Sequence, residues 1–137
     1  MSLVLDSSVT LARIYTDEVT EAVAQVFEQV ARAGAWVPSI WRLEVANGLQ
    51  QGVLKRRISV GFRNDSLADL ELFEISVDRE TDTFAWTSSL KLAERFRLTL
   101  YDACYLELAQ RRELPLASLD RELRAAGRAL DLRLLGV

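Results

Sequence analysis

The stretch Leu98–Asp120, LTLYDACYLELAQRRELPLASLD, decides the fold that the sequence predicts. Its first part has the apolar spacing of a helix over Tyr101–Arg111, and its second part is a short apolar strand over Pro115–Ser118. Asp102 lies near the start of the helix, and Asp120 follows the strand. Helices that alternate with buried strands are typical of a parallel α/β sheet. Ligands bind beyond the carboxyl ends of such strands, which is where an acid that follows a strand lies.

The same alternation of β-type and helical runs extends over the rest of the chain, and no repeat or Pro/Gly/Ser-rich linker offers a domain boundary. We therefore expect one domain over residues 1–137, a three-layer α/β/α fold with a mainly parallel central sheet. The expected strands are Ser2–Leu5, Ala35–Val37, Phe73–Val77, Pro115–Ser118 and Leu132–Leu135. The expected helices are Ser8–Tyr15, Glu18–Ala33, Ser39 (as N-cap) to about Lys55, Val60–Leu70, Thr81–Arg95, Tyr101–Arg111 and Arg121–Ala129.

Composition limits the classes of protein that the chain can belong to. With 137 residues, of which 50% are hydrophobic and 27% charged, it is typical of a soluble globular protein. No apolar run approaches the ~20 residues that span a bilayer, and MSLVLD lacks the basic start of a signal peptide. The lone Cys104 cannot form an internal disulfide, which is compatible with a reducing cytoplasm. Because the net charge is −3, any nucleic-acid partner must be held by a local basic patch and by metal.

Four carboxylates lie in runs that otherwise have the composition of a protein core: Asp6, Glu44, Asp102 and Asp120. Burying an ionised acid is costly, so four such acids call for a compensating partner. The chain has no His and one Cys, which argues against soft-metal sites and His-based catalysis. The remaining hard oxygen ligands suit Mg²⁺ or Mn²⁺.

Three of these acids also have a structural interpretation as helix caps. Asp6 precedes the helix expected near Ser8, Asp120 precedes the last helix, and Thr99 with Asp102 fits the [ST]-x-x-[DE] capping box. Glu44 is different because it lies inside its helix, where no cap is needed.

The alternative for Glu44 is a side chain that faces solvent or pairs with Arg42 or Lys55. Asp6, Asp102 and Asp120 fall at the same predicted edge of the sheet, and an acid in an apolar helix joins them. This combination favours a single acidic site over four separate structural roles.

Three motifs, in this order and spacing, carry a family resemblance: LVLDSSV (Leu3–Val9), VPSIWRLEVANGL (Val37–Leu49) and the stretch Leu98–Asp120. The chain resembles PIN-domain proteins, and in particular VapC-type toxins of bacterial toxin–antitoxin pairs. The resemblance implies a Mg²⁺- or Mn²⁺-dependent endoribonuclease that hydrolyses RNA, with a cognate antitoxin, a homodimeric state and a cytoplasmic location. It assigns the catalytic and metal-binding positions to Asp6, Glu44, Asp102 and Asp120. Ser7 and Ser118 match the small hydroxyl residues that the family places beside its site.

Basic and aromatic residues outside the motifs have two interpretations each. Lys55, Arg56 and Arg57 can grip RNA phosphates, or they can be a solvated helix end that complements the helix dipole. Arg111 and Arg112 have the same ambiguity. The three Trp residues can stack on bases or pack in the core or an interface.

Other functions with acidic α/β pockets fit the sequence less well. A receiver domain would pair a second acid with Asp6, and a haloacid-dehalogenase-type phosphatase needs D-x-D, whereas Asp6 is followed by Ser7 and Ser8. The remaining alternative is a catalytically silent PIN-like interaction module, although such modules commonly lose acids that this chain retains.

Overall fold

β1 (Val4–Leu5) is the central strand of a five-stranded parallel sheet in the computed structural model, which describes residues 1–137. The strand order is β3-β2-β1-β4-β5. The other strands are β2 (Ala35–Val37), β3 (Ile75–Val77), β4 (Leu116–Ala117) and β5 (Leu134–Leu135). All five predicted strands are present, although most are shorter than predicted. Leu3, Val4 and Leu5 are fully buried, as expected for a strand covered on both faces.

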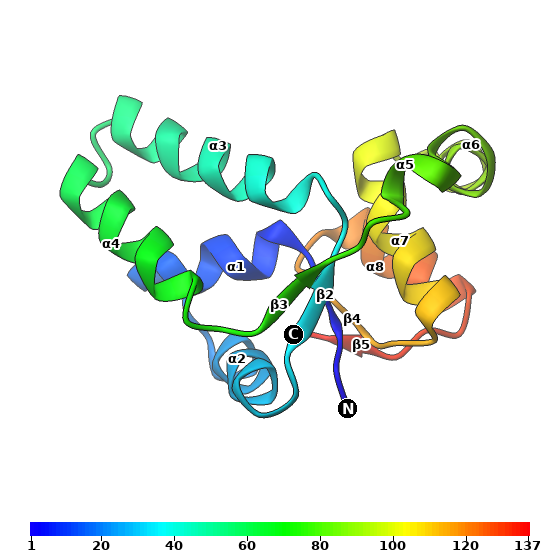
Figure 1. Ribbon diagram of the computed structural model, residues 1–137, viewed down its shortest axis with the longest axis horizontal. Coiled ribbons are helices and arrows are strands. Elements are labelled where there is room, and N and C mark those ends of the chain that lie inside the picture. Colours follow the sequence, from blue (N-terminus) through cyan, green and yellow to red (C-terminus); the bar gives the residue numbers. More distant parts are fainter.

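Helices cover both faces of the sheet (Figure 1). One layer holds α1 (Ser7–Ile14), α2 (Glu21–Ala33), α3 (Trp41–Leu54) and α4 (Val60–Leu70). The other layer holds α5 (Thr81–Phe84), α6 (Leu90–Phe96), α7 (Leu100–Arg112) and α8 (Arg121–Ala129). The three-layer α/β fold with a parallel sheet is therefore confirmed. Since the chain leaves β1 toward β2 and returns from β3 to β4 on the other side, the strand order reverses between β1 and β4. The ligand crevice of a doubly wound sheet lies at this reversal.

The predicted helices differ from the structure most clearly in three places. The helix predicted from Glu18 begins at Glu21, where Thr20 Oγ1 accepts the Val23 N–H at 3.2 Å, and Thr16–Glu18 forms a separate 3₁₀ turn, η1. The Ser39 N-cap was wrong: Ile40 is the cap residue, and the Ser39 N–H donates to Thr81 Oγ1 at 3.0 Å.

The third difference is a π-helical turn, η2 (Ala85–Ser89), which interrupts the helix predicted over Thr81–Arg95 and separates α5 from α6.

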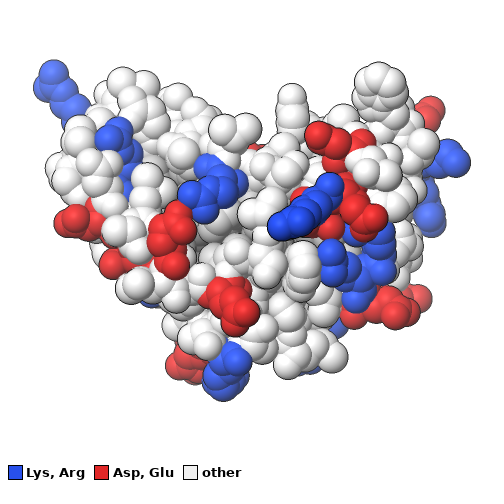
Figure 2. All heavy atoms as spheres, in the orientation of Figure 1, with Lys and Arg blue, Asp and Glu red and all other residues white.

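None of the helices combines the length and apolar composition that a membrane crossing requires. Charged side chains of both signs are scattered over the face shown in Figure 2, without a large basic patch.

Asp78, which follows β3, is the centre of a buried ionic network that braces the helices. Its side chain is 1% exposed; Oδ2 accepts from Arg111 at 2.7 Å, and Oδ1 accepts from Arg112 at 3.2 Å. Thr81 Oγ1 donates to Asp78 and accepts the N–H of Ser39, which links α7 to the loop before α3. Burial acts to raise the pKa of Asp78, but hydrogen bonds from the two arginines lower it below its ordinary value. Arg111 and Arg112 therefore bind a buried carboxylate.

Candidate active site

Asp6 lies directly after β1, at the reversal of strand order, and its side chain is 3% exposed. Its Oδ2 accepts hydrogen bonds from Ser8 Oγ at 2.6 Å and from Ser118 Oγ at 2.8 Å. Ser118 follows β4, so this contact joins the two strands that flank the crevice. Asp6 occupies the N-cap position of α1 but makes no side-chain capping bond. The capping interpretation of Asp6 was wrong.

Glu44 points from α3 toward α7, not into solvent. Its Oε1 accepts the O–H of Tyr105 at 2.5 Å and that of Ser7 at 3.4 Å. Ser7 Oγ also lies 3.5 Å from Asp6 Oδ1, between the two acids. Arg42, one of the alternative partners of Glu44, pairs with Glu71 at 2.7 Å instead. The structure therefore brings Asp6, Ser7 and Glu44 together.

Asp102 and Asp120 lie at helix starts, and here the capping interpretations are at least partly correct. Thr99 Oγ1 accepts the backbone N–H of Asp102 at 3.1 Å, so Thr99 caps α7. Asp120 Oδ1 accepts the Leu123 N–H at 2.8 Å and caps α8. The second oxygen of Asp120 makes no hydrogen bond within the chain. Capping and facing the crevice are therefore compatible for this residue.

The four acids lie near enough to alter one another's protonation. Burial is the largest cause that raises the pKa of Asp6, and Glu44 and Asp120 raise it further against the hydrogen bonds from Ser8 and Ser118. Burial also raises the pKa of Glu44, to which Asp102 adds.

For Asp102, burial and then the charges of Asp120 and Asp6 raise the pKa to about 6. Each acid therefore acts electrostatically on at least one other, so the four are linked by repulsion. The pattern is that of like charges in a partly buried crevice, where a cation would relieve the repulsion.

The donor set fits a hard divalent cation. The side chains that hydrogen-bond to Asp6 and Glu44 are all hydroxyls, so the available ligand atoms are oxygens, which Mg²⁺ and Mn²⁺ prefer. Glu44 Oε2 and Asp120 Oδ2 carry no hydrogen bond, and both are free to bind an ion. No three acidic or thiol side chains are already gathered as an ion site, because Asp6 and Glu44 are turned onto hydroxyl donors.

Two contributors to the site were not found in the sequence. Tyr105 is fully buried and orients Glu44, and the combination of burial and the two nearby carboxylates raises its pKa far above the ordinary value, so it remains a hydrogen-bond donor. It lies three residues after Asp102 and therefore on the same face of α7, a spacing from which its place beside the site could have been predicted. Ser8 was the other, two residues from Asp6.

The remaining sequence candidates lie away from the acids. Trp41 is buried and donates to Thr10, Trp36 packs under the Arg112 guanidinium at 3.5 Å, and Trp86 is 88% exposed. Burial raises the pKa of Cys104 to about 11, so its thiol stays protonated and unreactive at neutral pH.

Comparisons with known proteins agree with this fold. A family model described as PIN domain matches residues 3–129. PAE2754 of Pyrobaculum aerophilum superposes with a TM-score of 0.69 and 23% identity, over 92% of this chain and 79% of that one. A chain of VapBC2 from Rickettsia felis, solved bound to a DNA fragment from its promoter, superposes with a TM-score of 0.63 and 15% identity, over 98% and 97% of the two chains. The curated proteins contain no match.

Proposed function

Because the chain belongs to the PIN-domain family, we propose that it is a metal-dependent endoribonuclease that hydrolyses RNA phosphodiester bonds at the acidic cluster. The observation that carries the proposal is the clustering of Asp6, Glu44, Asp102 and Asp120 at the reversal of strand order, where burial and neighbouring acids raise the pKa values of Asp6, Glu44 and Asp102. No structural role of the fold requires this repulsion, and neither the Asp6 nor the Glu44 side chain makes a capping hydrogen bond.

The residues of the cluster have distinct roles in this proposal. Asp6, Glu44 and Asp102 would hold Mg²⁺ or Mn²⁺ directly or through water, and Asp120 would complete the set. The bound ion would acidify the attacking water and neutralise charge on the leaving oxygen. Ser8 and Ser118 hold the Asp6 carboxylate in one orientation, and Tyr105 does the same for Glu44.

Glu44→Gln is the sharpest test because it keeps the shape and Glu44 has no cap to lose. Labelled RNA is incubated with the purified protein in Mg²⁺ or Mn²⁺ and in chelator. We expect wild type to cleave only with metal, and Glu44→Gln to lose most of this activity. Glu94→Gln, a neutralised exposed acid on α6, is the matched control and should cleave normally. Normal cleavage by Glu44→Gln would show that the proposed site is wrong. A folded wild type that cuts no RNA would favour the silent interaction module.

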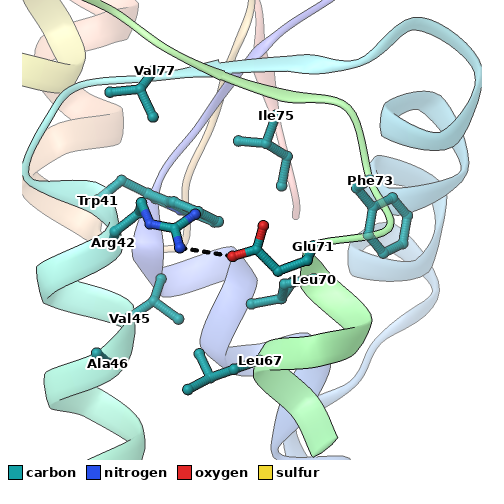
Figure 3. Close-up of a pocket in the computed structure, with 10 residues that line it drawn as sticks. All are labelled: Trp41, Arg42, Val45, Ala46, Leu67, Leu70, Glu71, Phe73, Ile75 and Val77. Carbon is teal, nitrogen blue, oxygen red and sulfur yellow. Dashed lines mark hydrogen bonds and ion pairs between the residues drawn. The ribbon is translucent and has the colours of Figure 1, made fainter. Parts of the chain in front are cut away.

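We further propose that the chain is the toxin of a toxin–antitoxin pair acting in the cytoplasm, in line with its likeness to the VapBC2 chain. An apolar cavity of about 260 Å³ lies between α3, α4 and β3 (Figure 3). The Arg42–Glu71 ion pair crosses it, and its lining includes Trp41, Val45, Leu67, Leu70, Phe73 and Ile75. An amphipathic antitoxin segment could bury apolar side chains there and insert a basic side chain among the acids.

Homodimerisation is the last part of the proposal. Trp86 is 88% exposed and Leu90, one turn further along, is 50% exposed, so this face leaves apolar area that a second copy would cover. Light scattering should give a dimer for wild type and a smaller species for Trp86→Ala. Co-expression with the product of the neighbouring gene tests the antitoxin, since a true partner should co-purify and inhibit cleavage.

A further inference from the structure

A groove of about 620 Å³ runs between α1 and the C-terminal half of α3. Ser8 and Tyr15 lie on the α1 wall, Gly48 and Lys55 on the α3 wall, and Arg57 at the far end. Four of its eleven lining residues are hydrophobic, against eight of ten in the cavity beside β3.

One end of this groove opens at the acidic cluster. Ser8 Oγ donates to Asp6 and accepts the Leu119 N–H at 2.9 Å, and both Ser8 and Leu119 line the groove. On the opposite wall, Gly48 lies one turn after Glu44 and therefore on the same face of α3. The eleven residue-to-residue steps from Glu44 to Lys55 correspond to about 16 Å of helix. At ~3.4 Å per stacked nucleotide, the groove has the length of a few nucleotides.

Two glycines one turn apart allow the walls to approach closely. A Cβ at Gly48 would lie 2.5 Å from Leu11 Cδ1, and one at Gly52 would collide with the Tyr15 hydroxyl. Tyr15 Oη donates to the Gly48 carbonyl at 2.9 Å and fixes the separation. The walls therefore meet on a narrow floor where the Leu11 and Tyr15 side chains pack against the two glycines.

The three basic residues Lys55, Arg56 and Arg57 differ in how they contact the groove. Arg57 donates to Asp17 at 2.9 and 3.1 Å and stacks over the Tyr15 ring at 4.0 Å, so its guanidinium is held in place. Lys55 has no carboxylate partner and lines the groove. Arg56, with φ of 58°, does not line it. Lys55 is thus the unpaired cation at the end of a channel that begins at the acids.

We propose that this groove carries the RNA strand on one side of the cleaved phosphate, with Lys55 contacting a backbone phosphate and Arg56 taking no part. The inference rests on the proposed ribonuclease function. The lining supplies what a single strand needs: a cation for phosphate, the Gln51 amide for sugar and base edges, and the Tyr15 ring beside Arg57. Glu18 at the rim is offset by Arg57, which lies 3.7 Å from it.

Lys55→Gln and Arg56→Gln form a matched pair, because both remove one positive charge from neighbouring exposed positions. Binding of fluorescein-labelled RNA is followed by anisotropy in chelator, where no cleavage occurs, at several salt concentrations. We expect Lys55→Gln to weaken binding several-fold and to reduce the salt slope by about 0.7, the value for one phosphate contact on a single strand. Arg56→Gln should leave both unchanged, and Lys55→Arg should restore binding.

The position of the strand is tested with RNAs that extend from the mapped cut site in one direction only. The Lys55→Gln defect should appear with one series and be absent with the other. The groove assignment would be wrong if Lys55→Gln and Arg56→Gln bound RNA equally well, or if the Lys55→Gln defect were the same for both directions of extension. In either case, cleavage by wild type would still support the proposed function. A wild type that neither binds nor cleaves RNA would remove both.

Discussion

Asp102→Asn should stabilise the metal-free protein at neutral pH. Burial and the neighbouring acids raise the pKa of Asp102 from 3.8 to about 6. Because this carboxyl binds its proton more tightly in the folded state, the free energy of unfolding falls as the pH rises from about 4 through 6. Above that range the loss of stability is constant. About two pKa units correspond to ~3 kcal/mol. Because Asp102 is only half-buried, solvent screening reduces this to about 1 kcal/mol.

Urea denaturation in chelator at pH 3 and pH 7.5 is the assay. Asn is neutral at both pH values, and wild-type Asp102 is protonated in both the folded and unfolded states at pH 3, so the advantage of Asn should be near zero at pH 3 and about 1 kcal/mol at pH 7.5. In saturating Mg²⁺ or Mn²⁺ the order should reverse, because wild type gains ~2.7 kcal/mol at a hundred times the dissociation constant and the variant gains less.

A control separates this repulsion from the helix dipole, which favours an acid in the first turn of α7 and acts in the opposite direction. Glu21 lies in the first turn of α2, away from the cluster. Glu21→Gln should lose a few tenths of a kcal/mol at pH 7.5 and show no response to metal. If Asp102→Asn behaves like Glu21→Gln, the four acids do not form one repulsive cluster.

Three further predictions address the residues that support the site. Tyr105→Phe removes the donor to Glu44 and should cost about 1.5–3 kcal/mol in urea denaturation; a loss below 0.5 kcal/mol would contradict the hydrogen bond seen here. Asp78→Asn leaves two arginines without their buried partner and should cost about 3–5 kcal/mol at pH 7. Since the pKa of Asp78 is lowered on folding, the difference from wild type should shrink as pH falls below about 4, and a constant difference would argue against the ion pair. Gly52→Ala should lower the melting temperature, because the new Cβ would displace the Tyr15 hydroxyl. Gly61→Ala, where there is open space, should raise the melting temperature or leave it unchanged. Equal shifts for the two variants would show that close packing at Gly52 is not the cause.

The sequence predicted the sheet and both helical layers because short apolar runs and helical spacing act locally. Some features that it missed involve partners that are distant in the sequence. The loop before α3 is held by the Ser39 N–H, which donates to Thr81, 42 residues later, and α3 begins after Ile40 rather than Ser39. Asp78 is preceded by a short strand and followed by charged residues, a context that predicts an exposed position. It is buried because Arg111 and Arg112 reach it from α7. No local pattern contains that contact.

The acids of the site could be predicted because the fold decides where they meet. In a parallel sheet each helix begins where a strand ends, so an acid that caps a helix also stands at the edge where ligands bind. Asp120 shows both at once, since one oxygen caps α8 and the other makes no hydrogen bond. The fact that an acid caps a helix is therefore no argument against its binding a ligand at this edge of the sheet. The interpretation depends on Asp6 and Glu44, whose side chains cap nothing and are held by hydroxyl donors in a crevice that raises their pKa values. Asp6 is the N-cap residue of α1 and Glu44 lies in the first turn of α3, where the helix dipole favours an acid. The ligand role proposed for them accounts for what this preference does not, the burial of Asp6 and the orientation of Glu44 toward α7.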